Sequence, residues 1–509
     1  MGPLSIVSLT FMSCIVLLIA EQPFNHCTCR GRVLNCRRRY FYRYRIGNKE
    51  DATASPQEGA TPNGSVPRLD VQTICPGATD VQLSNLNLRA FPGGLDQENI
   101  TKIDLSGNLI TALPDAGMLG PDVKRLDLSA NAIEGPGAEA EAEAQLRPLG
   151  ALEELLLGWN RLRHLSFLPA PCRLRRLQLT VNFIDRLDGG WLRRCALLES
   201  LTLLANNVSA LPAGAFAGLG HLRQLTLSMN PVQELSDRAF DGLSQLESLR
   251  MKNTRLATLP NNAFASLRHL DLLELSDNPF ASLPPHAFRG LVNLRSLDLN
   301  NALHNVTLNE NLFSELRNLR KLFLGRNSLT FLPNNIFHQQ NLLEELHLQS
   351  NLISHVSENT FTSLRNLKVL RLDRNHFAEM PGSIICNLPL LQELQMPYNR
   401  LTTLPDLAGC QSLRTANFFN NSVAAPSEAL VRAALARGPR DVGLEGNPVR
   451  ASSLRWVLRA GGVEAFALDC ACGGVRSRSS GAEVRFCVVA PCGPPSPFVS
   501  WMEAVAAAN

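Results

Sequence analysis

The chain has 509 residues, of which 45% are hydrophobic and 18% charged, so it can bury a large core. Its 49 basic and 45 acidic residues leave a formal net charge of only +4. No field of one sign is implied for the whole protein, which argues against nucleic acid as the default partner.

The first twenty residues have the pattern of a secretory signal peptide. Residues 4–19 are mostly apolar and uncharged, Ala20 is a small residue at a suitable cleavage position, and polar sequence begins at Glu21. An uncleaved anchor is the alternative, because no basic side chain precedes Leu4. We expect residues 1–20 to be cleaved and the rest to be secreted. No later stretch approaches the roughly 20 apolar residues that cross a bilayer.

Cysteines and glycosylation motifs fit that compartment. Thirteen cysteines become twelve once Cys14 leaves with the signal, and an even number in a secreted chain favours disulfides. Eight of them flank the central region, four on each side: Cys27, Cys29, Cys36, Cys75, Cys470, Cys472, Cys487 and Cys492. Five candidate N-glycosylation sites share the N-x-S/T pattern: Asn63, Asn99, Asn207, Asn305 and Asn420.

An insert at residues 37–69 interrupts the cysteine-rich segment 21–78. Residues 37–45, from Arg37 to Arg45, read RRRYFYRYR, and such a basic, aromatic run could bind a glycosaminoglycan. The following residues have the polar composition of a disordered segment without a role. An inaccurate gene model is a further alternative, and the sequence leaves all three open.

A repeat fills residues 79–450. The frame is L-x-x-L-x-L-x-x-N-x-φ, where φ is apolar, and the steps from Asn327 to Asn351, Asn375 and Asn399 are 24 residues each. Such a period predicts a solenoid, because one repeat cannot bury its apolar residues alone but a stack can. We name the asparagine position the Asn slot. About 16 units have these residues in it: Leu86, Asn108, Asn131, Asn160, Asn182, Asn206, Asn230, Thr254, Asn278, Ala302, Asn327, Asn351, Asn375, Asn399, Asn421 and Asn447.

The L-x-L core of each unit alternates with period 2, so each unit is predicted to begin with a short strand whose leucines point inward. We expect the slot amide to satisfy backbone groups just past the strand, and stacked amides to bond one another between units. Thr254 and Ala302 break this column, and we expect a local irregularity near Ala302, where Asn301 or Asn305 could substitute. A second column should stack as an aromatic spine on the convex side: Phe216, Phe240, Phe264, Phe288, Phe313, Phe337 and Phe361.

Two features interrupt the stack. The step from Asn131 to Asn160 is 29 residues, because residues 134–145 form an acidic insert that is expected to be a solvated loop. Four further cysteines precede the strands of neighbouring units and are either disulfide-bonded in pairs or buried thiols: Cys172 with Cys195, and Cys386 with Cys410.

The extended frame L-x-x-L-x-L-x-x-N-x-L-x-x-L-P-x-x-x-F-x-x-L resembles the typical 24-residue extracellular leucine-rich repeat. Similar members include the acid-labile subunit, the regulatory subunit of carboxypeptidase N, and Slit- and Toll-ectodomain-like repeats. The resemblance implies an α/β solenoid: a leucine-rich repeat horseshoe with a parallel concave β-sheet and an irregular, short-helical convex side.

The same resemblance implies cysteine-containing caps at residues 21–78 and 451–495, followed by a tail at 496–509. Both caps depart from the family pattern: no cysteine outside the signal precedes Cys27, and an apolar, helix-like stretch at 454–458 separates Asn447 from Cys470. The pairings it suggests are Cys27–Cys36, Cys29–Cys75, Cys470–Cys487 and Cys472–Cys492.

No catalytic motif is present, and we expect no enzyme activity, no cofactor and no metal site. The histidines His347, His355 and His376 lie in consecutive units, but no cysteine or carboxylate completes a ligand set around them.

The concave face is the predicted binding surface, because large apolar side chains at its outward positions need a reason. Exposed apolar residues are also common without a role. The candidate partner-binding residues are Leu156, Trp159, Val181, Leu204, Met229, Phe323, Tyr398 and Phe419. Charges of both signs lie between them, which favours a protein partner over a uniform polyanion.

The sequence therefore predicts a secreted, glycosylated, non-enzymatic protein that binds an extracellular protein ligand or receptor. One alternative is the ectodomain of a Toll-like or adhesion-type receptor whose membrane segment is missing. Another is a structural leucine-rich protein of the extracellular matrix.

Overall fold

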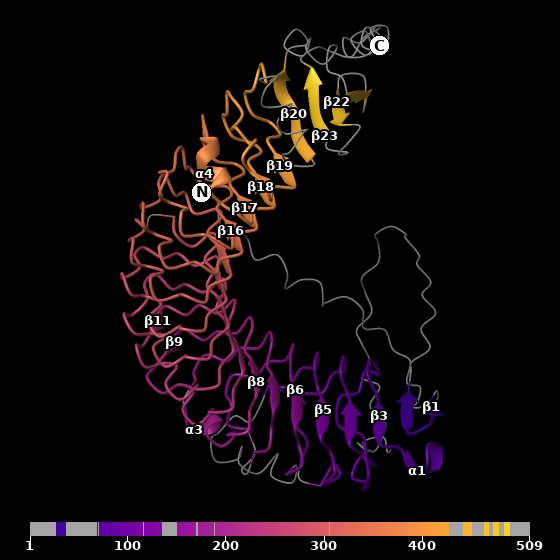
Figure 1. Cartoon of the computed structure of the whole chain (residues 1–509). Helices are drawn as coiled ribbons and strands as arrows, with labels where there is room; N and C mark the ends of the chain where they lie inside the picture. The colour runs from indigo at the N-terminus through magenta and orange to yellow at the C-terminus, as the bar shows by residue number, and fades with distance from the viewer. Residues whose placement is uncertain are drawn as a thin grey trace, which may run out of the picture. The chain divides into compact units, whose positions relative to one another are not determined.

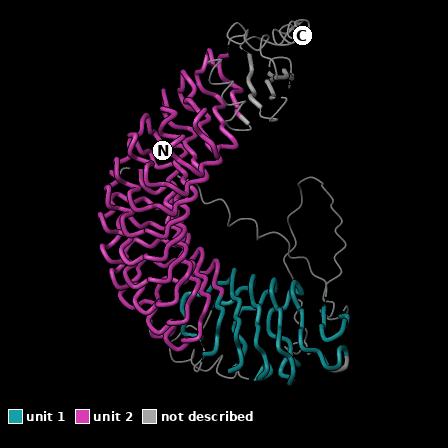
Figure 2. Tube along the Cα trace, viewed as in Figure 1, with its two compact units in different colours: residues 1–177 teal, residues 178–509 magenta. Residues whose placement is uncertain are grey.

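The computed structural model describes residues 27–36, 69, 71–115, 117–134, 150–168, 172–187, 189–304, 306–426, 441–449, 463–467, 472–477 and 483–488. These belong to two compact units, residues 1–177 and 178–509, which Figure 2 colours separately.

The first unit opens with an antiparallel hairpin that joins a parallel sheet. Strand β1 pairs with β2, β2 pairs in parallel with β3, and β3 to β6 continue the parallel series (Figure 1). Its elements are β1 (Cys27–Arg30), β2 (Val33–Cys36), α1 (Val71–Ile74), β3 (Asp80–Gln82), β4 (Lys102–Asp104), β5 (Arg125–Asp127), β6 (Glu154–Leu156) and β7 (Arg176–Gln178). One disulfide, Cys27–Cys36, joins β1 to β2, and a second, Cys29–Cys75, ties the hairpin to the residue after α1.

The second unit holds a longer parallel ladder, from β8 to β20, in which each strand pairs with the strand of the next repeat. Its ladder strands are β8 (Ser200–Thr202), β10 (Gln224–Thr226), β12 (Ser248–Arg250), β13 (Leu272–Glu274), β14 (Ser296–Asp298), β15 (Lys321–Phe323), β16 (Glu345–His347), β17 (Val369–Arg371), β18 (Glu393–Gln395), β19 (Thr415–Asn417) and β20 (Asp441–Val449). Outside the ladder lie α3 (Gly189–Leu192), α4 (Gly382–Cys386) and a two-stranded sheet of β9 (Ala210–Leu211) and β11 (Glu234–Leu235).

Three strands end the described part of this unit: β21 (Val463–Ala467), β22 (Cys472–Ser477) and β23 (Glu483–Val488). Strand β23 pairs in parallel with β20 and antiparallel with β22, and β22 pairs antiparallel with β21. The backbone register places Cys472 opposite Cys487, whereas Cys470 and Cys492 lie outside the described residues.

The Asn slot holds the rungs together by bonding backbone groups. In the repeat of Asn351, Nδ2 donates to the carbonyls of Leu348 and Leu324, both at 2.9 Å. The Oδ1 atom accepts from the N–H groups of Asn327 and Leu329. The same pattern recurs in both units, for example at Asn108, Asn131, Asn230 and Asn399. The expected bonds between stacked amide side chains do not form at the described slots, because each amide is already occupied by backbone groups.

The two breaks in the column have small effects. Thr254 donates its hydroxyl to Asn278 Oδ1, so it still bonds the next slot. At Ala302 the strands keep their register, and the expected irregularity is confined to the turn, where Asn327 Oδ1 accepts from Ala302 N and Leu303 N. Asn301 does not replace the missing amide, because its Nδ2 donates to Asp277 Oδ1. Asn305 lies outside the described residues.

Leucines and a phenylalanine spine form the core. Phe216 and Phe240 stack with ring centroids 6.0 Å apart, and Phe313 and Phe337 stack at 6.3 Å, so the predicted spine is confirmed. Cys386 and Cys410, in neighbouring repeats, form a disulfide. Cys172 and Cys195 are also disulfide-bonded. The predicted parallel leucine-rich repeat solenoid is thus the fold of this protein.

Candidate partner-binding face

The candidate surface is the strand face of the second unit, which is the exposed side of its parallel strands. In most of these strands only the middle residue is fully buried. Register aligns the third residues of the ladder strands from β10 to β19 in one line, which we name the central row: Thr226, Arg250, Glu274, Asp298, Phe323, His347, Arg371, Gln395 and Asn417.

Acidic side chains gather on β13 and β14. Arg250 Nε lies 3.6 Å from Glu274 Oε2, and Lys252 Nζ lies 3.3 Å from Asp277 Oδ2. Asp298 has no such ion pair within the described part of the chain. Burial raises the pKa of Asp298, and the charges of Glu274 and Asp277 raise it further, while a hydrogen bond from the backbone N–H of Asn300 and the charge of Lys252 lower it. This carboxylate is therefore partly desolvated, and the nearby Lys252 is ion-paired with Asp277 instead.

An aromatic pair follows on β15 and β16. The Phe323 and His347 rings lie 4.6 Å apart between centroids, at an angle of 51°. Burial lowers the pKa of His347, and the Arg371 guanidinium lowers it further, while Glu345 opposes both. His347 Nε2 is 3.7 Å from Glu345 Oε2, too far for a hydrogen bond. Phe323 thus stands between a carboxylate on one side and a histidine held toward its neutral form on the other.

Basic and aromatic side chains meet beyond this pair. The Arg374 guanidinium lies 4.5 Å from the centroid of the Tyr398 ring, and Tyr398 meets Phe419 edge to face at 5.4 Å. Arg371 Nε is 3.2 Å from Asp373 Oδ1. A groove of 560 Å³ adjoins this cluster and is lined by Glu393, Gln395, Thr415, Ala416, Asn417, Phe419, Gly443 and Glu445.

The residue before each Asn slot has a left-handed backbone, and we name these positions the left-handed row. Several hold residues that tolerate positive φ, such as Asn253, Asp277 and Asn301. Met229 (φ 59°) and Tyr398 (φ 56°) hold large side chains there, and they are 54% and 43% exposed. A left-handed conformation costs such residues roughly 1–2 kcal/mol. Their presence on an exposed surface therefore calls for a role other than stability.

The other predicted face residues differ in exposure. In the first unit, Trp159 occupies a left-handed position (φ 57°) and is 63% exposed, while Leu156 on β6 is half-buried. In the second unit, Val181, Leu204, Phe323 and Phe419 are half-buried. Tyr398 and Phe419 are the predicted residues that the structure brings into contact. Met229, Phe323 and Tyr398 lie on rungs several strands apart, so they form separate contact points.

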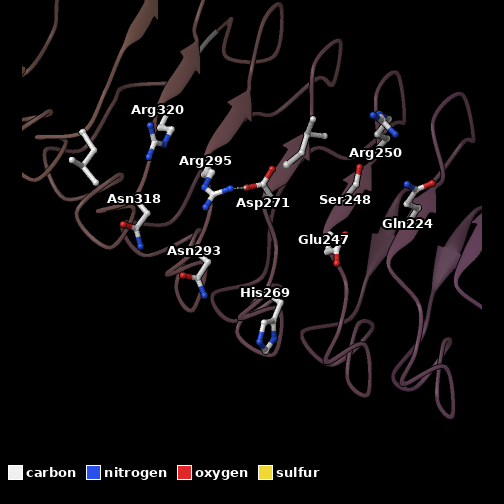
Figure 3. A pocket seen from close by; sticks show the side chains of 12 residues that line it. Gln224, Glu247, Ser248, Arg250, His269, Asp271, Asn293, Arg295, Asn318 and Arg320 are labelled. Atoms are coloured by element: carbon white, nitrogen blue, oxygen red, sulfur yellow. Dashed lines mark ion pairs between the residues drawn. The ribbon is translucent and has the colours of Figure 1, made fainter. Parts of the chain in front are cut away.

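A charged groove runs along the edge where the chain enters the strands (Figure 3). It has a volume of 680 Å³, and Arg295 Nη1 lies 3.4 Å from Asp271 Oδ1 within it. Farther along the same edge, Lys368 and Arg320 bond Glu344 at 2.7 and 2.5 Å, and these bonds lower the pKa of its carboxyl group. Such exposed pairs contribute little to stability and leave this edge nearly neutral.

Among the described residues, no three histidine, cysteine or acidic side chains gather as a metal site would require. Nor is any described helix long and apolar enough to cross a membrane.

Sequence reasoning missed the left-handed row, although a signal was present. Asparagine, aspartate, serine or glycine fill this position in half of the repeats, and asparagine, aspartate and glycine tolerate positive φ. Sequence reasoning also gave His347 no role beyond that of a surface residue. The sequence did not show that its ring would lie against Phe323.

Several predicted sites cannot be compared with the structure. Residues 37–45, Asn63, residues 135–145 of the acidic insert and the stretch at 454–458 lie outside the described residues. Of the remaining sequons, Asn99 and Asn207 are exposed, and Asn420 is half-buried on the strand face.

Comparisons with known proteins agree with this architecture. A leucine-rich repeat model matches residues 172–232, 221–280, 252–303, 273–329 and 317–377. Residues 172–377 are leucine-rich repeats. No curated protein sequence matches the chain.

Solved structures that are similar to this chain share little sequence with it. A leucine-rich repeat protein of Leptospira interrogans is 24% identical with a TM-score of 0.54, over 70% of this chain and 92% of its own. TLR13, in the TLR13–ssRNA13 complex, is 20% identical with a TM-score of 0.46, over 76% and 74%. The plant peptide hormone receptor RGFR1, in complex with RGF2, is 20% identical with a TM-score of 0.49, over 69% and 60%.

Proposed function

We propose that this chain is a secreted, non-enzymatic leucine-rich repeat protein that holds a protein partner on the strand face of its second unit. The observation that carries the proposal is the pair Met229 and Tyr398. Both expose large side chains from left-handed backbone positions, where asparagine or glycine would be less strained. Strain on an exposed surface is most simply explained by binding.

The chemistry of the surrounding face supports a protein over a uniform polymer. Tyrosine and arginine are enriched at the centres of protein interfaces, and Arg374 already lies over the Tyr398 ring. The groove beside Phe419 offers a recess of 560 Å³ for a side chain of the partner. Carboxylates and cations lie along the same face, which steers and orients a partner of mixed charge.

Secretion rests on the residues before Glu21 and on the disulfides of the cap. When the full chain is expressed in a secretory cell, we expect it in the medium, with Glu21 at its amino terminus and with mass lost on removal of N-linked glycans. A membrane-retained product with residues 1–20 intact would instead favour the uncleaved anchor.

Partner binding is tested by capture from native extracellular fluid followed by quantitative mass spectrometry. Tyr398→Ser should reduce the yield of the partner about tenfold or more, since central aromatic residues contribute roughly 2 kcal/mol or more at interfaces. Phe331→Ser is the matched control, because Phe331 is 48% exposed outside the strand face. Equal capture by both variants would contradict the proposal.

A further inference from the structure

We infer that the middle of the strand face binds an extended protein segment presenting a basic, an apolar and an acidic side chain, in that order across the strands. This inference rests on the proposed function, since it specifies the chemistry of the partner segment. Its basis is the sequence of charges along the central row, which register places side by side from β13 to β17.

At the acidic end of the central row, on β13 and β14, we expect the partner to supply a cation. Arg250 and Lys252 pair with Glu274 and Asp277, which leaves Asp298 as the carboxylate without an ion pair within the described residues. Its Oδ1 accepts a bond of 2.9 Å from Asn300 N, so the side chain is held in place on the face. A lysine or arginine placed here would gain a partly buried ion pair.

The middle calls for an apolar side chain. Phe323 is opposite Asp298 in the register and contacts His347 on its other side. The backbone beside Phe323 is covered by neutral amides, because Asn300 Oδ1 accepts from Gly325 N at 2.7 Å. A side chain at Gly325 would collide with the amide of Gln349, so no side chain covers the backbone at this point of the face.

The opposite end calls for an anion. Arg371 is next to His347 in the register, and Arg374 follows it three residues on. Arg371 is ion-paired with Asp373, whereas Arg374 lies over the uncharged ring of Tyr398. Among the described contacts, these two guanidinium groups therefore have a single carboxylate as partner. Arg326, exposed on the left-handed row, belongs to the repeat of Phe323, two repeats before Arg371.

The distances fit a short extended segment. Parallel strands are about 4.8 Å apart, so the three steps from Asp298 to Arg371 span about 14 Å. An extended chain advances about 3.3 Å per residue, so this span takes about four residues. Residues i, i+2 and i+4 of such a chain point to the same side. The segment therefore has the pattern basic–x–apolar–x–acidic, read in one chain direction or the other. A polyanion does not fit, since Asp298 and Glu274 would repel it.

The test uses fluorescent peptides of defined charge order and the full secreted chain. The dipolar probes contain Lys-Ser-Phe-Ser-Glu or its reverse, Glu-Ser-Phe-Ser-Lys, between Gly-Ser flanks. The control probes contain Lys-Ser-Phe-Ser-Lys and Glu-Ser-Phe-Ser-Glu. We expect one dipolar probe to bind at least fivefold more tightly than both controls in fluorescence anisotropy.

Variants locate the two ends. Asp298→Asn keeps the acceptor for Asn300 N and should weaken the dipolar probe about fivefold. Arg371→Glu should reverse the preference so that Lys-Ser-Phe-Ser-Lys binds best, which a merely damaged fold would not produce. Arg365→Glu, an exposed change off the strand face, should alter nothing.

Three outcomes would overturn the inference: no dipolar probe binds at millimolar concentration, a control probe or heparin binds as tightly, or Arg371→Glu does not change the preference. A partner whose capture survives Asp298→Asn and Arg371→Glu but is lost in Tyr398→Ser would also overturn it. That last result would leave the proposed function standing, so the two failures are distinguishable.

Discussion

The Asn slot and the left-handed row are adjacent in sequence, yet they follow opposite rules. Slot amides such as Asn351 are buried and bond the backbone of two repeats. The residues just before them, such as Met229 and Tyr398, are exposed, and their identity changes from repeat to repeat. The residue in the slot is determined by the hydrogen bonds of the scaffold, whereas the side chain in the left-handed row makes no such bonds in the described part of the chain. A residue in the row that adopts positive φ at a cost in free energy therefore carries functional information. A slot residue other than asparagine carries structural information.

The largest effect should come from the slot. Asn351→Ala removes the partners of two buried carbonyls and two buried N–H groups. Each unsatisfied group costs about 1–3 kcal/mol, partly relieved by local rearrangement, so we expect a loss of about 3 kcal/mol. The midpoint of denaturant unfolding measures it. Ser350→Gly, one residue away at positive φ, should not destabilise. Equal losses in both variants would remove the distinction between the two columns.

A smaller effect of opposite sign is expected in the left-handed row. Met229→Asn places a residue that tolerates positive φ where a long side chain now stands, and should raise stability by about 1 kcal/mol. The reciprocal change Asn253→Met should lower stability by a similar amount, which thermal unfolding would measure. If Met229→Asn destabilises, the side chain is part of the fold and its exposure says nothing about binding.

The smallest effects should appear as pH dependence on the strand face. The pKa of His347 is lowered in the folded state, mainly by burial, so its protonated form is disfavoured there. Stability should therefore be unaffected above the ordinary value of 6.5 and fall as the pH drops below it. His347→Gln should remove this part of the decline between pH 7.5 and 5, measured as the midpoint of thermal unfolding. An unchanged profile would place His347 in solvent.

Asp298 should give the opposite pH dependence of stability. Burial raises the pKa of Asp298 in the folded state above the ordinary value of 3.8, so the ionised carboxylate lowers stability at neutral pH. This loss of stability shrinks as the pH falls below the folded pKa and is gone below 3.8. Asp298→Asn should therefore stabilise at pH 7 but not at pH 3. A destabilised variant at pH 7 would mean that the carboxylate has a cation within the protein.

Much of the scaffold was predictable because the repeat is periodic. Aligning on Asn351 and its equivalents fixes which leucines are buried and which phenylalanines stack. The positive φ at Met229 was not predicted, because backbone conformation is not visible in a hydrophobic pattern. The neutral tendency of His347 was not predicted either, since it depends on Phe323 and Arg371 from neighbouring rungs. Ala302 was expected to disturb more than it does, because Asn327 bonds both backbone N–H groups there.

Covalent capture from the strand face tests the central claim most directly. A photo-crosslinking amino acid replaces Tyr398 in one sample and Phe331 in another, and both proteins are irradiated in native extracellular fluid. The account predicts a discrete adduct with a protein partner from position 398 and none from position 331. Adducts of the same protein from both positions, or from position 331 alone, would contradict it.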